Sequence, residues 1–431
     1  MRQILLTLFL SGVFLLTSLT AQSTRPPNLQ ALIKEALNQN PQLKAYRHLT
    51  KARDAEVPAA GALPDPTLGI NLLNLPWNNP VFDQEAMSGK QISLAQKIPF
   101  PGKLGLKKEI AKQEAQIARA NYEELKNRLI KKVKEAYYDL FYIDQAILTT
   151  QKNQVLLKEF VEIATTKYAV GKGLQQDVLK AQVELAHQSD LLLTFRQKRR
   201  TVEARLNRLL NAPPQTTYGR VPQPDIRKLY AFQKQSNTFA INRRPLLVAW
   251  QKRLQQSKEK ISLARKNFWP DFSLSLAYTQ RDVLISGQGG TDFISLGLRF
   301  NLPVYFRAKQ SPLLQASLYQ KNFTEESLSN TRNEINEALD NALSALQKNL
   351  NLEKLYRLSI IPQARQALES ARAGYQNDKV DFLTLLNNEI TLFKFELSHQ
   401  RIVSDSFKSF AELEYVVGHT LQNTSNTAEE R

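Results

Sequence analysis

YAVGKGLQQDVLKAQVEL (residues 168–185) and YQNDKVDFLTLLNNEITL (residues 375–392) are two versions of one pattern. In the ungapped pairing, Tyr168 falls on Tyr375. Other landmarks recur at nearly the same offset, among them Pro64-Asp65 with Pro270-Asp271, and QISLAQKIP with FISLGLRFNLP. A repeat of about 205 residues is too long for a solenoid unit. The sequence therefore predicts two equivalent structural repeats that assemble around an axis.

The composition is typical of long helices and offers little chemistry. Glycine is scarce, with 15 residues in 431, and Leu, Ala, Lys, Gln, Glu and Asn dominate long stretches. The absence of cysteine excludes disulfides, thiolate metal sites and thiol nucleophiles. The four histidines have no metal-ligand spacing, and there is no nucleophile elbow, P-loop or dinucleotide fingerprint. We expect no enzyme activity, no cofactor and no metal site.

The formal net charge is +18 at pH 7. Lys and Arg are spread over the predicted helix faces, mixed with Glu and Gln, and do not gather with aromatic residues in a groove. This pattern predicts no nucleic-acid partner, although a basic surface can still attract anionic lipid or an acidic protein.

The N-terminus has the features of a secretory signal peptide at residues 1–21. Arg2 supplies the positive start, residues 4–19 the apolar core, and a cleavage site follows Ala21. No later segment has the roughly 20 apolar residues that a membrane helix needs. A mature chain that enters a membrane must therefore do so as a β-barrel.

The first predicted repeat covers residues 22–211. It begins with a helix over 28–60, which has a local break at 38–41, and continues with a strand over 67–75 and a second strand that ends at Ile98. A break at IPFPGK (98–103) leads into a helical arm of about 70 residues. A turn at Gly171 and Gly173 then leads into a return arm of about 38 residues. The return arm and the first helix together match the long arm in length. Stacked end to end, they would build a wall of uniform height.

The second predicted repeat covers residues 242–417, after a proline-rich linker at 212–241. Its elements are a helix over 242–268, strands over 271–278 and 293–300, a long arm that ends near Asn377-Asp378, and a return arm that ends near Val417. Residues 418–431 form a polar tail, which we expect to be disordered.

The four strands have the alternation of transmembrane β-strands, with one apolar face and one small or polar face. Aromatic residues near their ends suit a membrane interface; they are Trp77, Trp269, Tyr278, Phe300, Tyr305 and Phe306. Four strands cannot close a barrel, because closure needs about eight or more, whereas three copies would supply twelve. The alternative is a periplasmic coiled-coil scaffold without a pore, in which soluble hairpins cap the coiled coils.

These features resemble the outer-membrane efflux protein family, the TolC-like channels, over nearly the whole mature chain. The resemblance is carried by the P-F-P-G-K junction at 99–103, by the turn motif at 168–182 and by its degenerate second copy at Tyr375. The LPVYFRAKQ stretch at 302–310 is similar to the metal-efflux branch.

The resemblance implies an α+β membrane protein and a homotrimer. A twelve-stranded barrel in outer-membrane lipid would be continued by a long helical barrel through the periplasm. A periplasmic adaptor (membrane fusion) protein and an inner-membrane pump of the RND or ABC type would dock at the helical turns. The function implied is a passive exit duct for metal cations or small toxic organic molecules. The exit duct of a type I protein-secretion system is an alternative that the residues do not exclude.

The resemblance also implies that acidic residues at the turns narrow the pore. Asp177 occupies the motif position of the first turn, but Thr384 stands at its counterpart, so a double acidic ring does not follow. The residues expected to shape the aperture or the adaptor-docking turns are Tyr168, Gly171, Gly173, Asp177, Tyr375, Asp378, Asp381, Thr384 and Asn387. The alternative is that the tyrosines pack the turns and the aspartates cap helices.

Overall fold

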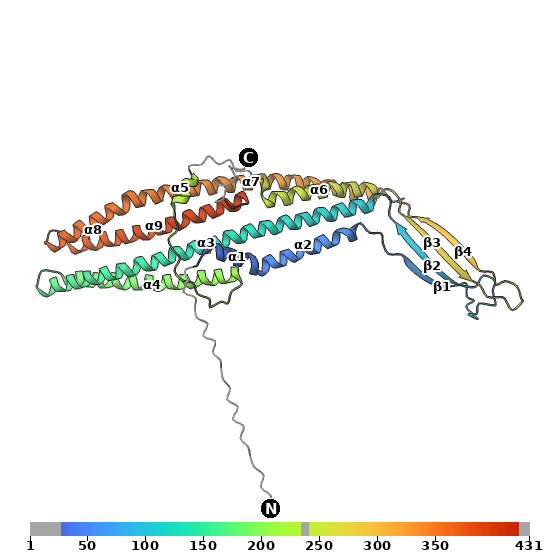
Figure 1. The fold of residues 1–431 in the computed structure, drawn as a ribbon, viewed down its shortest axis with the longest axis horizontal. Coiled ribbons are helices and arrows are strands. Elements are labelled where there is room, and N and C mark those ends of the chain that lie inside the picture. Colours follow the sequence, from blue (N-terminus) through green and yellow to red (C-terminus); the bar gives the residue numbers. More distant parts are fainter. Residues whose placement is uncertain (1–26, 234–240, 422–431) are drawn as a thin grey trace, which may run out of the picture.

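The computed structural model describes residues 27–233 and 241–421, in which long helices lie at one end and a four-stranded sheet at the other (Figure 1). The predicted signal peptide and most of the predicted tail lie outside these residues. Within them, no helix is both long and apolar enough to cross a membrane.

The first half of the chain follows the expected order of elements, which are α1 (Leu29–Gln39), α2 (Pro41–Ala60), β1 (Thr67–Leu73), β2 (Gly89–Ile98), α3 (Lys103–Ala169) and α4 (Gln175–Leu210). The predicted break near 38–41 separates α1 from α2. Asn40 lies between them, and its side chain accepts from the Leu43 amide at 3.1 Å and donates to the Leu209 carbonyl at 2.9 Å. At 1.5 Å per residue, α3 is about 100 Å long.

The second half repeats the order with α6 (Pro245–Lys266), β3 (Phe272–Gln280), β4 (Phe293–Phe300), α7 (Gln310–Leu355), α8 (Ile361–Gln376) and α9 (Phe382–Val417). The sequence predicts one uninterrupted arm before the second turn, and the structure differs. A π-helical turn, Tyr356–Ile360, separates α7 from α8, and Pro362 follows it. Proline has no backbone N–H and clashes with the preceding helical turn, and a π turn relieves both problems without ending the helix.

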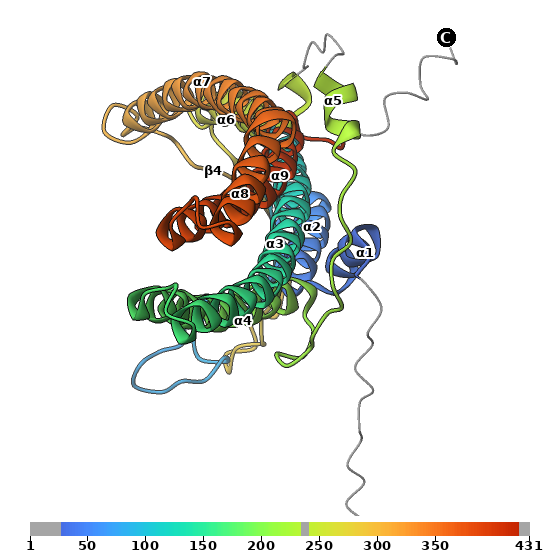
Figure 2. The ribbon, with the colours of Figure 1, turned by 90° about the vertical axis from the view of Figure 1, so that its left-hand side faces the viewer.

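The helices stack as the arm lengths predict. In Figure 1, α4 lies along the half of α3 near the turn, and α2 lies along the half near the sheet. Likewise, α9 and α6 share the length of the α7 and α8 arm. Figure 2, seen toward the turns, shows the helices along an arc, with α1 and the segment before α5 (Arg227–Gln233) on its convex side.

The sheet is antiparallel, with strand order β1-β2-β3-β4, so that β2 and β3 join the two halves. Residues that face each other across neighbouring strands share one side of the sheet. Leu68, Leu94, Leu276 and Leu296 form one such row of apolar side chains, all at least half exposed. The next row, formed by Gly69, Ser93, Ala277 and Ser295, is small or polar. In these two rows the predicted alternation is present on all four strands.

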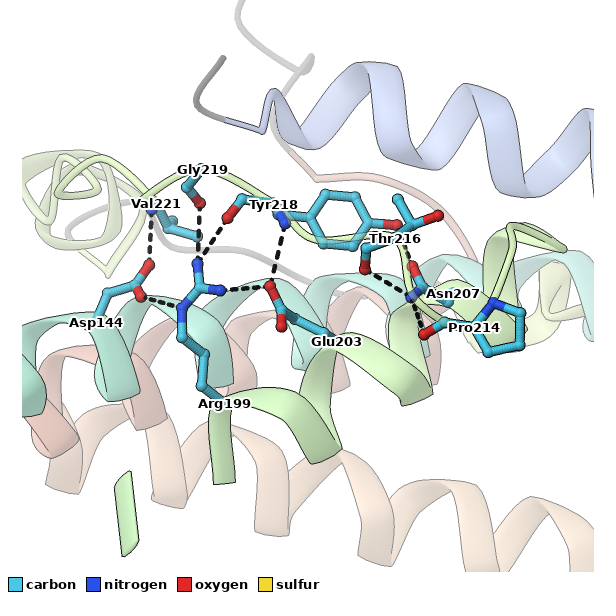
Figure 3. A network of polar contacts seen from close by, with 9 residues as sticks. All are labelled: Asp144, Arg199, Glu203, Asn207, Pro214, Thr216, Tyr218, Gly219 and Val221. Atoms are coloured by element: carbon cyan, nitrogen blue, oxygen red, sulfur yellow. Dashed lines mark hydrogen bonds and ion pairs between the residues drawn. The ribbon is translucent and has the colours of Figure 1, made fainter. Parts of the chain in front are cut away.

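Residues 212–233, here called the strap, run from the end of α4 to α5, and the sequence does not predict the short helix α5. A buried polar network holds the strap to α3 and α4 (Figure 3). The Arg199 guanidinium donates to Asp144 at 2.8 Å, to Glu203, and to the strap carbonyl of Tyr218 at 2.8 Å. Asp144 in turn accepts from the strap amide of Val221 at 2.9 Å.

Candidate functional site at the helical turns

The two helical turns lie at the end of the molecule opposite the sheet (Figure 1) and close in the same way. The Lys172 amide donates to the Lys167 carbonyl, and the Lys379 amide donates to the Gly374 carbonyl, each at 2.8 Å. These four residues occupy equivalent positions in the ungapped pairing. Amide-to-carbonyl bonds of this span are the usual way to satisfy the last carbonyls of a helix.

Gly171 and Asp378 are also equivalent, and both have left-handed backbones, with φ of +72° and +56°. Glycine adopts this conformation without strain, and aspartate tolerates it better than most residues. The predicted importance of Gly171 thus has a backbone reason, and Asp378 serves the second turn in the same place.

Gly173 does not have a left-handed backbone, and glycine is needed there because a side chain would not fit. A Cβ atom there would lie 3.0 Å from the Lys167 Cβ and 3.1 Å from the Tyr168 amide nitrogen. In the second turn the small residue has moved: Val380 occupies the position equivalent to Gly173, and Gly374 the position equivalent to Lys167. A Cβ on Gly374 would lie 2.5 Å from a Val380 methyl carbon. In each turn two residues face each other closely, and one of the two is glycine. In the first turn it is the later residue, Gly173, and in the second turn the earlier one, Gly374.

The two equivalent tyrosines have different environments. Tyr168 is 48 % exposed, whereas Tyr375 is 6 % exposed and packs against Phe382 with ring centroids 5.5 Å apart. Burial, followed by the nearby charges of Asp177 and Asp378, raises the pKa of Tyr375. Tyr375 thus belongs to the apolar core of the tip, while Tyr168 is available to solvent or to a partner.

Lys167 joins the two turns, and sequence reasoning missed it. Its ammonium group donates to the Tyr375 carbonyl at 2.6 Å, pairs with Asp378 and lies 4.3 Å from the centre of the Tyr375 ring. The hydrogen bond and charge of Lys167 hold the pKa of Asp378 below its ordinary value. The second copy of the motif has glycine at the equivalent position, so the pairing of the two copies gave no sign of this contact.

Asp381 and Asp177 both lie at helix N-termini, the first at the N-cap of α9 and the second within the first turn of α4. Asp381 caps α9 by accepting from the Thr384 amide at 2.7 Å, and this contact with Thr384 lowers its pKa. Asp177 lies in the first turn of α4, where the helix dipole favours a negative charge. Asp381 is therefore a helix cap, as the alternative interpretation expects. The role of Thr384 is to donate its backbone amide to the Asp381 carboxylate.

An open cleft of about 780 Å³ separates the two turns, and it brings together most of the predicted residues. Its charged lining is mixed: Lys167, Lys172, Lys180, Lys379, Asp177, Asp378 and Asp381. Tyr168, Thr384 and Asn387 are not part of this lining, and Asn387 lies exposed on α9. Among the described residues, no group of three or more His, Cys, Asp or Glu side chains is placed to hold a metal ion.

Comparison with known proteins decides the family. The family model described as "Outer membrane efflux protein" matches residues 32–212 and 239–414, which include all four strands, the first long hairpin and all but the last three residues of the second. The chain belongs to this family. It is therefore an efflux protein of the outer membrane, and the family is one of channels rather than of enzymes.

The individual matches are distant in sequence, and the solved structures among them are similar in fold. The cobalt-zinc-cadmium resistance protein CzcC of Cupriavidus metallidurans is 20 % identical over 95 % of this chain and 94 % of its own length. Among solved structures, the channel protein CusC matches with a TM-score of 0.76 at 15 % identity, over 91 % of this chain and 92 % of that chain. The outer membrane protein VceC from Vibrio cholerae matches with a TM-score of 0.75 at 17 % identity, over 91 % and 96 %.

Proposed function

We propose that the chain is the exit duct of a tripartite efflux pump. Three copies form a twelve-stranded barrel in the outer membrane and a helical tunnel in the periplasm. An inner-membrane transporter of the RND or ABC type supplies the energy, and a periplasmic adaptor connects the two. The family membership supports the channel, and the geometry of a single chain supports its assembly.

The observation that carries the assembly is the sheet with two open edges and one apolar face. β1 and β4 each pair with a strand on one side only, and unpaired strand edges seek another strand. The exposed apolar face has the character of a lipid contact, since it would otherwise be a large apolar patch in water. Copies that join β4 of one chain to β1 of the next satisfy the edges and keep the apolar face outside.

The arc of helices in Figure 2 supports the same assembly. Three arcs side by side close a tube, with the strap on the outer surface and the small, polar side of the sheet toward the lumen. The turns then form the periplasmic end of the tunnel. Opening proceeds as an iris, in which the α8 and α9 hairpin separates from the α3 and α4 hairpin and the adaptor holds the turns.

The substrate class that we propose is metal cations, with small toxic organic molecules as the alternative. The LPVYFRAKQ stretch and the similarity to CzcC support metals. The test is the sensitivity of a deletion strain to a panel of divalent and monovalent metals beside dyes, detergents and antibiotics. Selective metal sensitivity supports the proposal, and selective sensitivity to organic compounds contradicts the metal assignment. Unchanged sensitivity to both classes contradicts the efflux role and favours protein secretion.

The channel itself is tested on the purified protein. The duct requires extraction by detergent, a heat-resistant trimer, and discrete conductance steps in planar lipid bilayers. A soluble protein without conductance would establish the non-porous scaffold instead. If Asp177 narrows the aperture, Asp177→Ala raises the single-channel conductance, and unchanged conductance removes Asp177 from the gate.

A further inference from the structure

The small, polar side of the sheet carries only two ionisable side chains within the four strands, Lys97 on β2 and Arg299 on β4. The remaining residues of that side are neutral: Thr67, Gly69, Asn71, Leu73, Gly89, Gln91, Ser93, Ala95, Ser273, Ser275, Ala277, Thr279, Phe293, Ser295 and Gly297. The charge of this surface is therefore decided by two cations.

The two cations lie in one row. Lys97 is the direct partner of Ser273, and Ser273 is the direct partner of Arg299 on its other side. At the usual spacing of neighbouring strands, their Cα atoms are about 10 Å apart. Both side chains are exposed. The row lies near the end of the sheet that meets the helices, since β2 ends at Ile98 and β4 at Phe300.

Two carboxylates lie just outside the strands at this end, Asp65 before β1 and Asp271 before β3, and among the described residues neither forms an ion pair with Lys97 or Arg299. Asp271, just before β3, accepts from the Lys103 ammonium group at 2.8 Å and from the Phe100 amide at 2.8 Å. Lys103 is 5 % exposed, so this ion pair belongs to the junction between sheet and helices. Lys97 and Arg299 thus keep their charges on the open surface.

We propose that Lys97 and Arg299 form a basic girdle inside the barrel that gives the channel a preference for anions. The inference rests on the proposed trimeric channel, in which this side of the sheet faces the lumen and three copies place six cations at one level. Rings of basic side chains favour the passage of anions through pores. The solutes favoured are small anions and anionic complexes; of the metals proposed as substrate, the girdle favours those that carry an excess of anionic ligands and opposes the free cations.

The girdle acts through the electrostatic field in a water-filled lumen, so its effect depends on ionic strength. The Debye length is about 30 Å at 0.01 M salt and about 3 Å at 1 M salt. The preference is therefore strong in dilute salt and disappears in concentrated salt. A preference that came from the width of the pore alone would not vanish in this way.

The experiment measures the reversal potential of the reconstituted full-length protein in a planar bilayer under a gradient of dilute potassium chloride. The wild type is expected to pass chloride in preference to potassium. The double variant Lys97→Gln/Arg299→Gln lowers the chloride-to-potassium permeability ratio, on the order of twofold or more in dilute salt. Lys97→Glu/Arg299→Glu reverses the preference. Raising the salt with the wild type provides a measurement that does not depend on any variant.

The matched control is Lys90→Gln. Lys90 lies on β2, as Lys97 does, but on the apolar side of the sheet, where it is the direct partner of Leu72. Its ammonium group pairs with Asp282 at 3.1 Å. Its loss should leave the permeability ratio unchanged. A conducting pore whose ratio is the same in the wild type and the double variant overturns the girdle and leaves the channel standing. A protein that forms no pore contradicts the proposed function itself.

Discussion

The hydroxyl group of Tyr230 donates a hydrogen bond to the carboxylate of Glu353 at 2.5 Å, which ties the strap to the last turn of α7. Glu353 also accepts from Arg357, in the π-helical turn, at 2.9 Å. Burial, followed by this contact with Glu353, raises the pKa of Tyr230 to about 12, so the hydroxyl stays protonated and remains a donor. The strap is thus attached to both halves of the chain, at Arg199 on α4 and at Glu353 in the last turn of α7.

Removing the Tyr230 hydroxyl should weaken this attachment without disturbing the packing of the ring. Tyr230→Phe is expected to destabilise the protein by about 1.5–3 kcal/mol, the usual contribution of a hydrogen bond to a charged group. The measurement is the thermal midpoint of the detergent-solubilised protein. Tyr319→Phe is the control, because Tyr319 on α7 is 64 % exposed. Equal midpoints for the two variants would show that the hydroxyl contributes nothing to the attachment.

Arg199 is the cation of the network in Figure 3, where it contacts two carboxylates and two strap carbonyls. Arg199→Met leaves Asp144 and Glu203 buried without their cation, which costs about 3–5 kcal/mol. The adjacent Arg200 is exposed, and Arg200→Met is the control. Limited proteolysis should cut the strap of the Arg199 variant faster than that of the control. Equal cleavage rates would contradict the role of the network.

Loss of the Lys167 contact should loosen the tip. Lys167→Ala removes the ammonium group that reaches the Tyr375 carbonyl and Asp378, and a higher single-channel conductance is the expected result. Lys158→Ala removes the same charge from an exposed position on α3, about two and a half turns earlier. If both variants raise conductance equally, the effect comes from charge in the tunnel and not from the link between the turns.

Glu389 makes the stability of the tip depend on pH. Burial first, then the negative charges of Glu396 and Glu369, raises its pKa to about 7 from an ordinary value of 4.5. The folded chain therefore holds this proton more tightly than the unfolded chain, and its stabilising contribution is complete below about pH 4.5. It declines as the pH rises to about 7 and is lost above that value, a change on the order of 3 kcal/mol.

The corresponding variant is Glu389→Gln, which keeps the shape of the side chain and cannot ionise. Thermal midpoints at pH 5 and pH 8 should differ less in the variant than in the wild type, and the variant should be the more stable protein at pH 8. Glu369→Gln is the companion variant, with a smaller effect in the same direction. A wild-type pH dependence that survives in Glu389→Gln would exclude this carboxyl as its source.

Local pattern was enough to predict most of the elements. The strand over 293–300 is found as predicted, and α3 and α4 end and begin at the predicted turn. The errors lie where local rules compete. β1 ends at Leu73 instead of residue 75, because Asn74 turns left-handed with φ of +50° and binds the segment before β2 through Ser88. The π turn before Pro362 escaped prediction, since helical periodicity gives no sign of one extra residue in a turn.

The candidate site was predicted in part. Pairing of the two motif copies selected Gly171, Asp378 and Tyr375, all of which have a definite place in the turns. It could not distinguish the exposed Tyr168 from the buried Tyr375, because the two positions are identical in the sequence and differ only in their neighbours. It also missed Lys167, whose importance comes from a contact with the other half of the chain.

The sequence by itself determined the duplicated order of elements, the long arms and the two-sided strands, because these follow from periodicity, from glycine and proline positions and from contacts close along the chain. Only the tertiary structure decided which side chains meet across the two halves: Lys167 with Tyr375, Tyr230 with Glu353, and Lys97 with Arg299 in one row. Such contacts join residues far apart in the chain, and their geometry depends on the register and packing of whole helices and strands. No local pattern contains that information.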